Sequence, residues 1–201
     1  MDLINPEFLI TNGGLLLVAF IVFAESGLLF GFFLPGDTLL LLTGIIASSG
    51  KFSILTAVIT IVVSAILGGI SGYYIGKKFG PKLFKKSDGI LFKKEYIKKS
   101  EDFYEKHGNL TIILARFLPI VRTFVPVLAG VGNMNVKKFG LYNAVGGVLW
   151  GAGVTLVGYF FGKHIPNIEK LILPVVLSVV VLSFGPTIYH LFKNSKTRSK
   201  L

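Results

Sequence analysis

Two arginines inside an otherwise apolar stretch are the residues best suited to do chemistry. Arg116 and Arg122 stand in the run from Leu110 to Val131, with Pro119 between them. A charged side chain near the centre of a bilayer costs roughly 2.5 to 3.5 kcal/mol on insertion scales, so such charges are compensated and functional. Guanidinium groups suit phosphate oxygens better than lysine does. The pattern therefore predicts a binding site for an anion, formed by both arginines.

Two acids in apolar surroundings are suited to balance these arginines. Glu25 and Asp37 belong to the first third of the chain, far from Arg116 and Arg122 in sequence. One interpretation is structural, with the four charges forming salt bridges that hold two parts of the protein together. The interpretation that we favour is functional. The arginines bind an anionic headgroup, and the two acids exchange protons as the site changes access.

The composition is that of a polytopic membrane protein. The 201 residues are 52% hydrophobic and only 15% charged, which is more apolar material than one small soluble core can hold. The chain has no cysteine, so thiol catalysis and cysteine-ligated metals are excluded. The three histidines are isolated in sequence, and we expect neither a metal site nor a cofactor. The acidic first residues and the lack of a cleavage site indicate no removable signal peptide.

The net charge of +11 is concentrated beside apolar segments. Ten lysines fall between Lys77 and Lys106, and four more cations follow residue 192. This distribution is the positive-inside pattern, which places both segments in the cytoplasm. The basic segment contains no recognisable nucleic-acid reader, so membrane lipids are the expected partners.

Hydropathy predicts several membrane segments of two kinds. Three apolar runs are long enough to cross a hydrocarbon core of about 30 Å, and a fourth is just long enough. They are Ser53 to Gly76, Phe139 to Phe161 and Leu171 to Phe192, with Phe8 to Ala24 as the fourth. In contrast, Gly27 to Leu34 and Thr38 to Ser49 are short and flank a turn at Pro35-Gly36-Asp37. They predict a hairpin that dips into the membrane and returns.

The chain repeats itself at an offset of 84 to 87 residues. Phe33-Leu34-Pro35 recurs as Phe117-Leu118-Pro119, and Gly72 to Lys77 resembles Gly158 to Lys163. We expect one domain over residues 1–201, with repeat one at about 8–80, a cytoplasmic basic connector at 81–108, repeat two at 109–165, a last span at 171–192 and a basic tail at 193–201. Each repeat is predicted to be a proline-broken re-entrant hairpin followed by a glycine-rich transmembrane helix. The residues expected to shape the hairpins are Pro35, Gly36, Pro119, Pro126 and Gly130.

The predicted fold class is an all-α membrane protein with two inverted repeats and flanking terminal helices. A cytoplasmic connector makes the first hairpin enter from outside and the second from inside, an arrangement that many transporters use to build a midplane substrate site. Both termini are cytoplasmic if Phe8 to Ala24 crosses the membrane. The glycine clusters of the long helices favour close helix packing and permit, without requiring, a homodimer. Trp150 is interpreted as a packing residue or an interface anchor.

The order of these motifs resembles the DedA family, whose shared region is called the SNARE-associated or VTT domain. The resemblance covers nearly the whole chain and is carried by Glu25, Pro35-Gly36-Asp37, the run Arg116 to Arg122, Pro126, Ala129-Gly130, Met134, Phe139, Asn143, Gly146 and Trp150. It implies a bacterial inner-membrane protein that moves lipid headgroups between leaflets. The associated substrates are undecaprenyl phosphate and phosphatidylethanolamine. It also implies a link to the proton motive force and essential roles for Glu25, Asp37, Arg116 and Arg122.

We therefore expect a proton-coupled lipid transporter and not an enzyme. One alternative is a lipid-phosphate phosphatase that uses the same arginines, although no histidine stands near them in sequence to act as a nucleophile or base. A second alternative is a transporter of small solutes or ions. A third is a purely structural membrane factor, which would tolerate the loss of both arginines.

Overall fold

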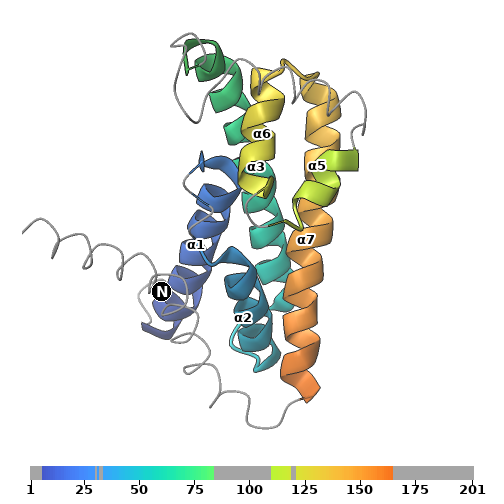
Figure 1. Ribbon diagram of the computed structural model, residues 1–201. Coiled ribbons are helices and arrows are strands. Elements are labelled where there is room, and N and C mark those ends of the chain that lie inside the picture. Colours follow the sequence, from blue (N-terminus) through green and yellow to red (C-terminus); the bar gives the residue numbers. More distant parts are fainter. Residues whose placement is uncertain (1–5, 30, 32–33, 84–109, 119–120, 165–201) are drawn as a thin grey trace, which may run out of the picture.

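The computed structural model describes residues 6–29, 31, 34–83, 110–118 and 121–164. Within these ranges, side chains are described for residues 13–80 and from residue 110 onward. This part of the chain is helical and contains no strand (Figure 1). The helices are α1 (Pro6–Gly27), α2 (Gly36–Ser48), α3 (Ile54–Leu83), α5 (Leu110–Ala115), α6 (Val121–Val131) and α7 (Val136–His164). Most of the predicted connector, the span at 171–192, the basic tail and Pro119 lie outside the described residues.

Two long apolar helices extend through the whole height of the bundle. Helix α3 has 30 residues and α7 has 29, or about 45 Å each at 1.5 Å per residue, which exceeds a hydrocarbon core of about 30 Å. They contain the predicted spans Ser53 to Gly76 and Phe139 to Phe161. In Figure 1 they run in opposite directions. Hydropathy therefore located both spans correctly.

Helices α2 and α6 are about half as long and begin in the middle of the bundle. With 13 and 11 residues they measure about 20 Å and about 16 Å, too short to cross a hydrocarbon core. Figure 1 shows that α2 runs from the middle to the end where α3 begins, whereas α6 runs from the middle to the opposite end. The N-terminal turns of the two half-length helices therefore face each other within the bundle.

The first hairpin differs from the one expected from sequence. The predicted entry arm, Gly27 to Leu34, is not a separate helix, because α1 continues to Gly27 and its N-terminal part includes the predicted segment Phe8 to Ala24. The chain then reverses through short-range hydrogen bonds, from Gly31 N–H to Leu28 O at 2.8 Å and from Leu34 N–H to Gly31 O at 2.9 Å. Helices α1 and α2 thus lie on either side of the Pro35 turn, and α1 corresponds to the predicted segment Phe8 to Ala24.

The surface of the described bundle is apolar, and several polar side chains are buried. Large hydrophobic side chains on α3 are exposed at four-residue intervals, at Leu55, Ile59, Val63 and Leu67. The most buried side chains include Glu25 at 0% and the two arginines at 5% each. Because this distribution is the reverse of a water-soluble protein, it fits a bundle surrounded by lipid.

Each half-length helix packs closely against the long helix that is remote from it in sequence. Helix α2 lies against α7 and α6 lies against α3. A Cβ atom on Gly44 would overlap the backbone of α7 at Thr155, and one on Gly130 would overlap the backbone of α3 at Tyr73. Small residues allow helices to approach this closely. Gly76 and Gly158, from the glycine clusters for which the sequence predicted close packing, make the same kind of contact, with the backbones of Val127 and Leu41. This packing fixes the positions of the first turns of α2 and α6.

Candidate functional site

The facing ends of the half-length helices carry two of the charges of the site. Asp37 is the second residue of α2, and Arg122 is the second residue of α6. A helix N-terminus carries a partial positive charge of about +0.5. Asp37 is therefore well placed, whereas Arg122 adds a full positive charge to an end that is already positive. The first turn of α6 consequently needs anionic partners.

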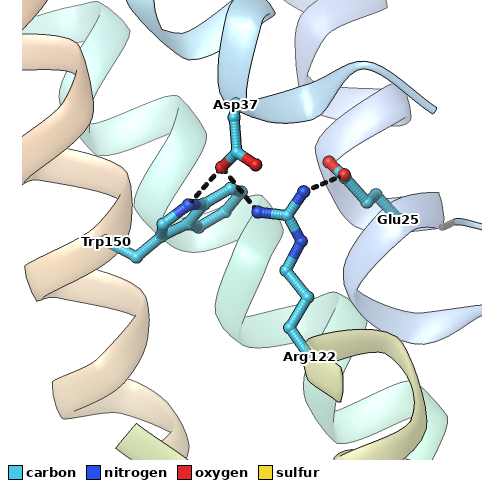
Figure 2. A network of polar contacts seen from close by, with 4 residues as sticks. All are labelled: Glu25, Asp37, Arg122 and Trp150. Atoms are coloured by element: carbon cyan, nitrogen blue, oxygen red, sulfur yellow. Dashed lines mark hydrogen bonds and ion pairs between the residues drawn. The ribbon is translucent and has the colours of Figure 1, made fainter. Parts of the chain in front are cut away.

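Arg122 binds both of the acids that the sequence singled out. Its Nη1 atom donates to Asp37 Oδ1 at 2.6 Å, and its Nη2 atom donates to Glu25 Oε1 (Figure 2). The side chains of Arg122 and Glu25 are 4% and 0% exposed, while that of Asp37 is 45% exposed. The three residues come from α6, α1 and α2. The predicted charge pairing between the two halves therefore exists, with one arginine serving two carboxylates.

Trp150 of α7 completes this cluster. Its indole Nε1 donates to Asp37 Oδ1 at 2.7 Å, and the Arg122 Cζ atom lies 4.7 Å from the centroid of its ring (Figure 2). A guanidinium within about 6 Å of an indole ring gains a cation–π attraction. Trp150 is 1% exposed and is the middle residue of α7. It is therefore a core residue, as one sequence interpretation had it, rather than an interface anchor, and it also contacts both charges.

Arg116 is held separately in a slot formed by glycines. Its Nη2 atom donates to Asn143 Oδ1 at 2.5 Å and to the carbonyl of Ala65 at 2.9 Å. A Cβ atom on Gly69 would lie 2.9 Å from Nη2, and one on Gly146 would lie 3.3 Å from the Arg116 side chain. Among the described residues, no carboxylate lies within ion-pair distance of Arg116. The structure thus does not give the two arginines a common partner.

The predicted hairpin-shaping residues act in different ways. Pro35 precedes α2 and its carbonyl accepts the first helical bond, from Leu39 N–H at 3.0 Å. A Cβ atom on Gly36 would overlap the carboxylate of Glu25, so a larger residue there would displace this side chain.

Pro126, expected to help shape the second hairpin, lies inside α6. Helix α6 continues through it, and only the N–H that would bond to the Arg122 carbonyl is missing. One lost bond is tolerated because Pro126 is buried and packs against Gly72 of α3.

Comparisons with known proteins identify the family of the chain. The VTT domain family matches residues 34–160. Protein DedA of Escherichia coli (strain K12) is 39% identical over 182 residues, which cover 90% of this chain and 83% of DedA. The chain belongs to the DedA family of membrane proteins. No solved structure matches it significantly.

Two further relatives extend the comparison across the family. The inner membrane protein YqjA of Escherichia coli is 32% identical over 191 residues, covering 90% of this chain and 85% of YqjA. An uncharacterized membrane protein of Mycobacterium leprae is 40% identical over 197 residues, covering 98% and 88% of the two chains. Both alignments cover most of the two chains compared, which supports a bacterial membrane protein of the DedA family.

Reasoning from residue types missed the two polar residues that α7 contributes to this DedA-family site. Asn143 and Trp150 are seven residues apart, or about two helical turns, so they lie on one face of α7. Asn143 also donates from Nδ2 to the carbonyl of Ile66 at 3.0 Å. An amide inside an apolar span was the signal that could have revealed this face, since polar residues inside a membrane segment are rarely incidental.

Proposed function

We propose that this DedA-family protein moves an anionic lipid headgroup between the leaflets of the bacterial inner membrane, that protons drive the movement, and that the protein is not an enzyme. The substrate class is a phosphate-bearing lipid, such as undecaprenyl phosphate or phosphatidylethanolamine. The observation that carries the proposal is the position of Arg122. It is buried between the first turns of two half-length helices, with two acids that neutralise it when no ligand is bound.

The helix arrangement supports an inverted-repeat transporter. In this proposal α1–α2 and α5–α6 are re-entrant hairpins that enter from opposite sides and meet near the bilayer midplane. Two observations support it: α2 and α6 run in opposite directions from the middle of the bundle, and each packs on the long helix of the other repeat. Transporters built this way place their substrate site where the broken helices meet.

The electrostatics of the meeting point suit an anion. Both facing helix ends direct their partial positive charges toward it, and a helix N-terminus favours a nearby anion. Arg122 Nε is buried and has no hydrogen-bond acceptor within the described part of the chain, so this N–H is available to a ligand oxygen. Arg122 therefore binds the headgroup directly in this proposal, while Arg116 keeps the surrounding potential positive.

Glu25 and Asp37 compete with the headgroup for Arg122. Protonation of Glu25 removes the negative charge beside Nη2 and frees that donor for a phosphate oxygen. The affinity for the headgroup then rises as the pH falls, which couples lipid movement to protons. The fully buried Glu25 and the partly exposed Asp37 supply an inner and an outer position for the proton.

A topology follows if the basic segment from Lys77 to Lys106 faces the cytoplasm. Helix α3 then runs inward from the outer side. Helix α1 begins at the same end of the bundle as α3 in Figure 1, so the start of α1 belongs on the outer side. This assignment replaces the cytoplasmic N-terminus that the sequence suggested on the assumption of a complete first crossing.

The decisive test is headgroup movement in proteoliposomes that contain the full chain. Fluorescent polyprenyl phosphate and phosphatidylethanolamine are compared under an imposed pH gradient, for the native protein and for Arg122→Gln. We expect gradient-dependent movement of at least one lipid and its loss in the variant. The control is Lys138→Gln, which removes a cation from the exposed end of α7. Absence of movement with folded protein contradicts the proposal, and release of inorganic phosphate would favour the phosphatase instead.

Proton coupling has its own test. Binding of the lipid phosphate is measured between pH 5.5 and 8.5 for the native chain and for Glu25→Gln. The native protein should bind more tightly as the pH falls, whereas the variant should bind with a nearly constant affinity because it has no proton to gain at that position. An unchanged pH profile in Glu25→Gln rules out Glu25 as the coupling group.

A further inference from the structure

One oxygen atom of Asp37 is shared by donors from two different helices. Oδ1 accepts from Arg122 Nη1 at 2.6 Å and from Trp150 Nε1 at 2.7 Å (Figure 2). A carboxylate oxygen has two lone pairs and can accept both bonds at once. In the transport mechanism proposed above, Asp37 competes with the headgroup for Arg122 through this oxygen, and the indole has no assigned role.

The two donors differ in their freedom to move. Trp150 is 1% exposed and packs within a buried apolar cluster, so its rotamer is fixed. The members of that cluster are Val22, Leu40, Ile61 and Ala65. Arg122 is a long side chain with several rotatable bonds, and its Nε has no acceptor among the described residues. When Arg122 turns away, the indole N–H therefore remains on Asp37.

The ring of Trp150 also stays in contact with the arginine. The guanidinium carbon lies 4.7 Å from the ring centroid, and a planar cation can slide over an aromatic face without losing the attraction. The same side chain thus holds the acid with its edge and supports the moving cation with its face.

We propose that Trp150 is a positioning residue for headgroup binding. From α7, its indole holds the carboxylate of Asp37, which belongs to α2, while Arg122 exchanges that carboxylate for the phosphate of the lipid. The inference rests on the proposed function. Without the indole N–H, Arg122 is the main donor to Asp37, and the separation of Arg122 from the Asp37 carboxylate becomes less favourable. Headgroup affinity therefore depends on a group that need not touch the lipid.

The first test measures binding instead of transport. The full chain in detergent is titrated with a short-chain phosphatidic acid as a probe, by isothermal titration calorimetry. Trp150→Phe keeps an aromatic ring and removes the N–H. It should weaken binding by roughly tenfold, the size expected for one hydrogen bond to a charged group. Tyr73→Phe is the matched control, because it removes a buried hydrogen bond to the Met134 carbonyl outside the site and should bind as the native chain does. Native affinity in Trp150→Phe overturns the proposal.

A double-mutant cycle separates positioning from direct contact. In an Asp37→Ala background, Trp150→Phe should cause little further loss of probe affinity, because the side-chain oxygen through which Trp150 acts is already absent. If the tenfold loss persists in that background, the indole acts on the ligand itself and the positioning role is wrong.

A spectroscopic test leaves Trp150 and its apolar cluster unaltered. Trp150 is the sole tryptophan of the chain, so intrinsic emission reports on this site alone. Addition of the probe should change the emission of the native protein as Arg122 moves, and Arg122→Gln should abolish the change. Calorimetric binding without any change in emission contradicts the proposal. Neither readout needs transport, so a failure of lipid movement and a failure of the positioning role can be told apart.

Discussion

Replacing Arg122 with glutamine should destabilise the protein far more than the loss of any exposed cation. The substitution leaves Glu25, which is 0% exposed, without its cation, and removes one of the two donors to Asp37. Removing one partner of a buried ion pair costs about 3 to 5 kcal/mol, because the other charge stays buried and uncompensated. For a chain of this size that corresponds to a fall in Tm of roughly 6 to 20 °C.

The reasoning also predicts a partial rescue. Glu25→Gln alone leaves Arg122 paired with Asp37 and stacked on Trp150, so its cost should be smaller, about 1.5 to 3 kcal/mol. The double variant Glu25→Gln with Arg122→Gln buries two neutral amides in place of the ion pair. Its loss of stability should be less than the sum of the two single losses by about 1 to 3 kcal/mol.

Thermal unfolding in detergent, followed by circular dichroism, measures all three variants. Lys138→Gln is the matched control, since it removes a cation that is exposed near the start of α7 and should change stability by less than about 0.5 kcal/mol. Strict additivity of the two single losses, or an Arg122→Gln variant as stable as the control, would refute the view that the pair is buried and coupled.

Three further substitutions follow from the same contacts and can use the same unfolding assay. Gly36→Ala should lower the stability by about 1 to 3 kcal/mol and weaken headgroup binding, because the added Cβ atom overlaps the Glu25 carboxylate. The control Gly13→Ala, on open helix surface, should be neutral or stabilising, and equal effects of the two substitutions would contradict the contact. Gly130→Val should force α6 away from α3 at a similar cost, with Gly153→Ala as the unhindered control, and native stability in Gly130→Val would disprove the close approach. Asn143→Leu should lower the stability by about 1 to 3 kcal/mol, because it removes a hydrogen-bond acceptor from buried Arg116. Asn143→Asp keeps an acceptor and should retain stability, and the reverse order of the two variants would show that Asn143 does not stabilise Arg116.

Much of the fold was predictable because hydropathy is a local property. The free energy of placing a segment in lipid depends on its own residues, so the extents of α3 and α7 could be read from composition and length. The break between α5 and α6 was likewise signalled by the proline-containing run after Arg116. The entry arm of the first hairpin was mispredicted because Gly27 to Leu34 is as apolar as the helix that precedes it. Hydropathy cannot tell such a reversal from a helix.

The charged residues of the site were recognisable, but their partners were not. Four ionisable groups in apolar surroundings identify a site by the cost of burying them. Which acid pairs with which arginine depends on contacts between residues that are far apart in sequence. Arg122 contacts Asp37, 85 positions away, and Glu25, 97 positions away. The glycines of the long helices were correctly expected to allow close packing, yet only the fold shows that Gly69 and Gly146 also make room for Arg116.

By itself, the sequence determined that this is a helical membrane protein with four ionisable groups in apolar surroundings, because transfer energies and backbone constraints act residue by residue along the chain. Tertiary structure alone decided that one arginine serves both acids, that the other lies in a glycine slot beside Asn143, and that Trp150 binds Asp37 from 113 positions away. The physical reason is that a hydrogen bond or an ion pair depends on distances of about 3 Å between groups. Those distances are set by how the half-length helices pack against the long ones.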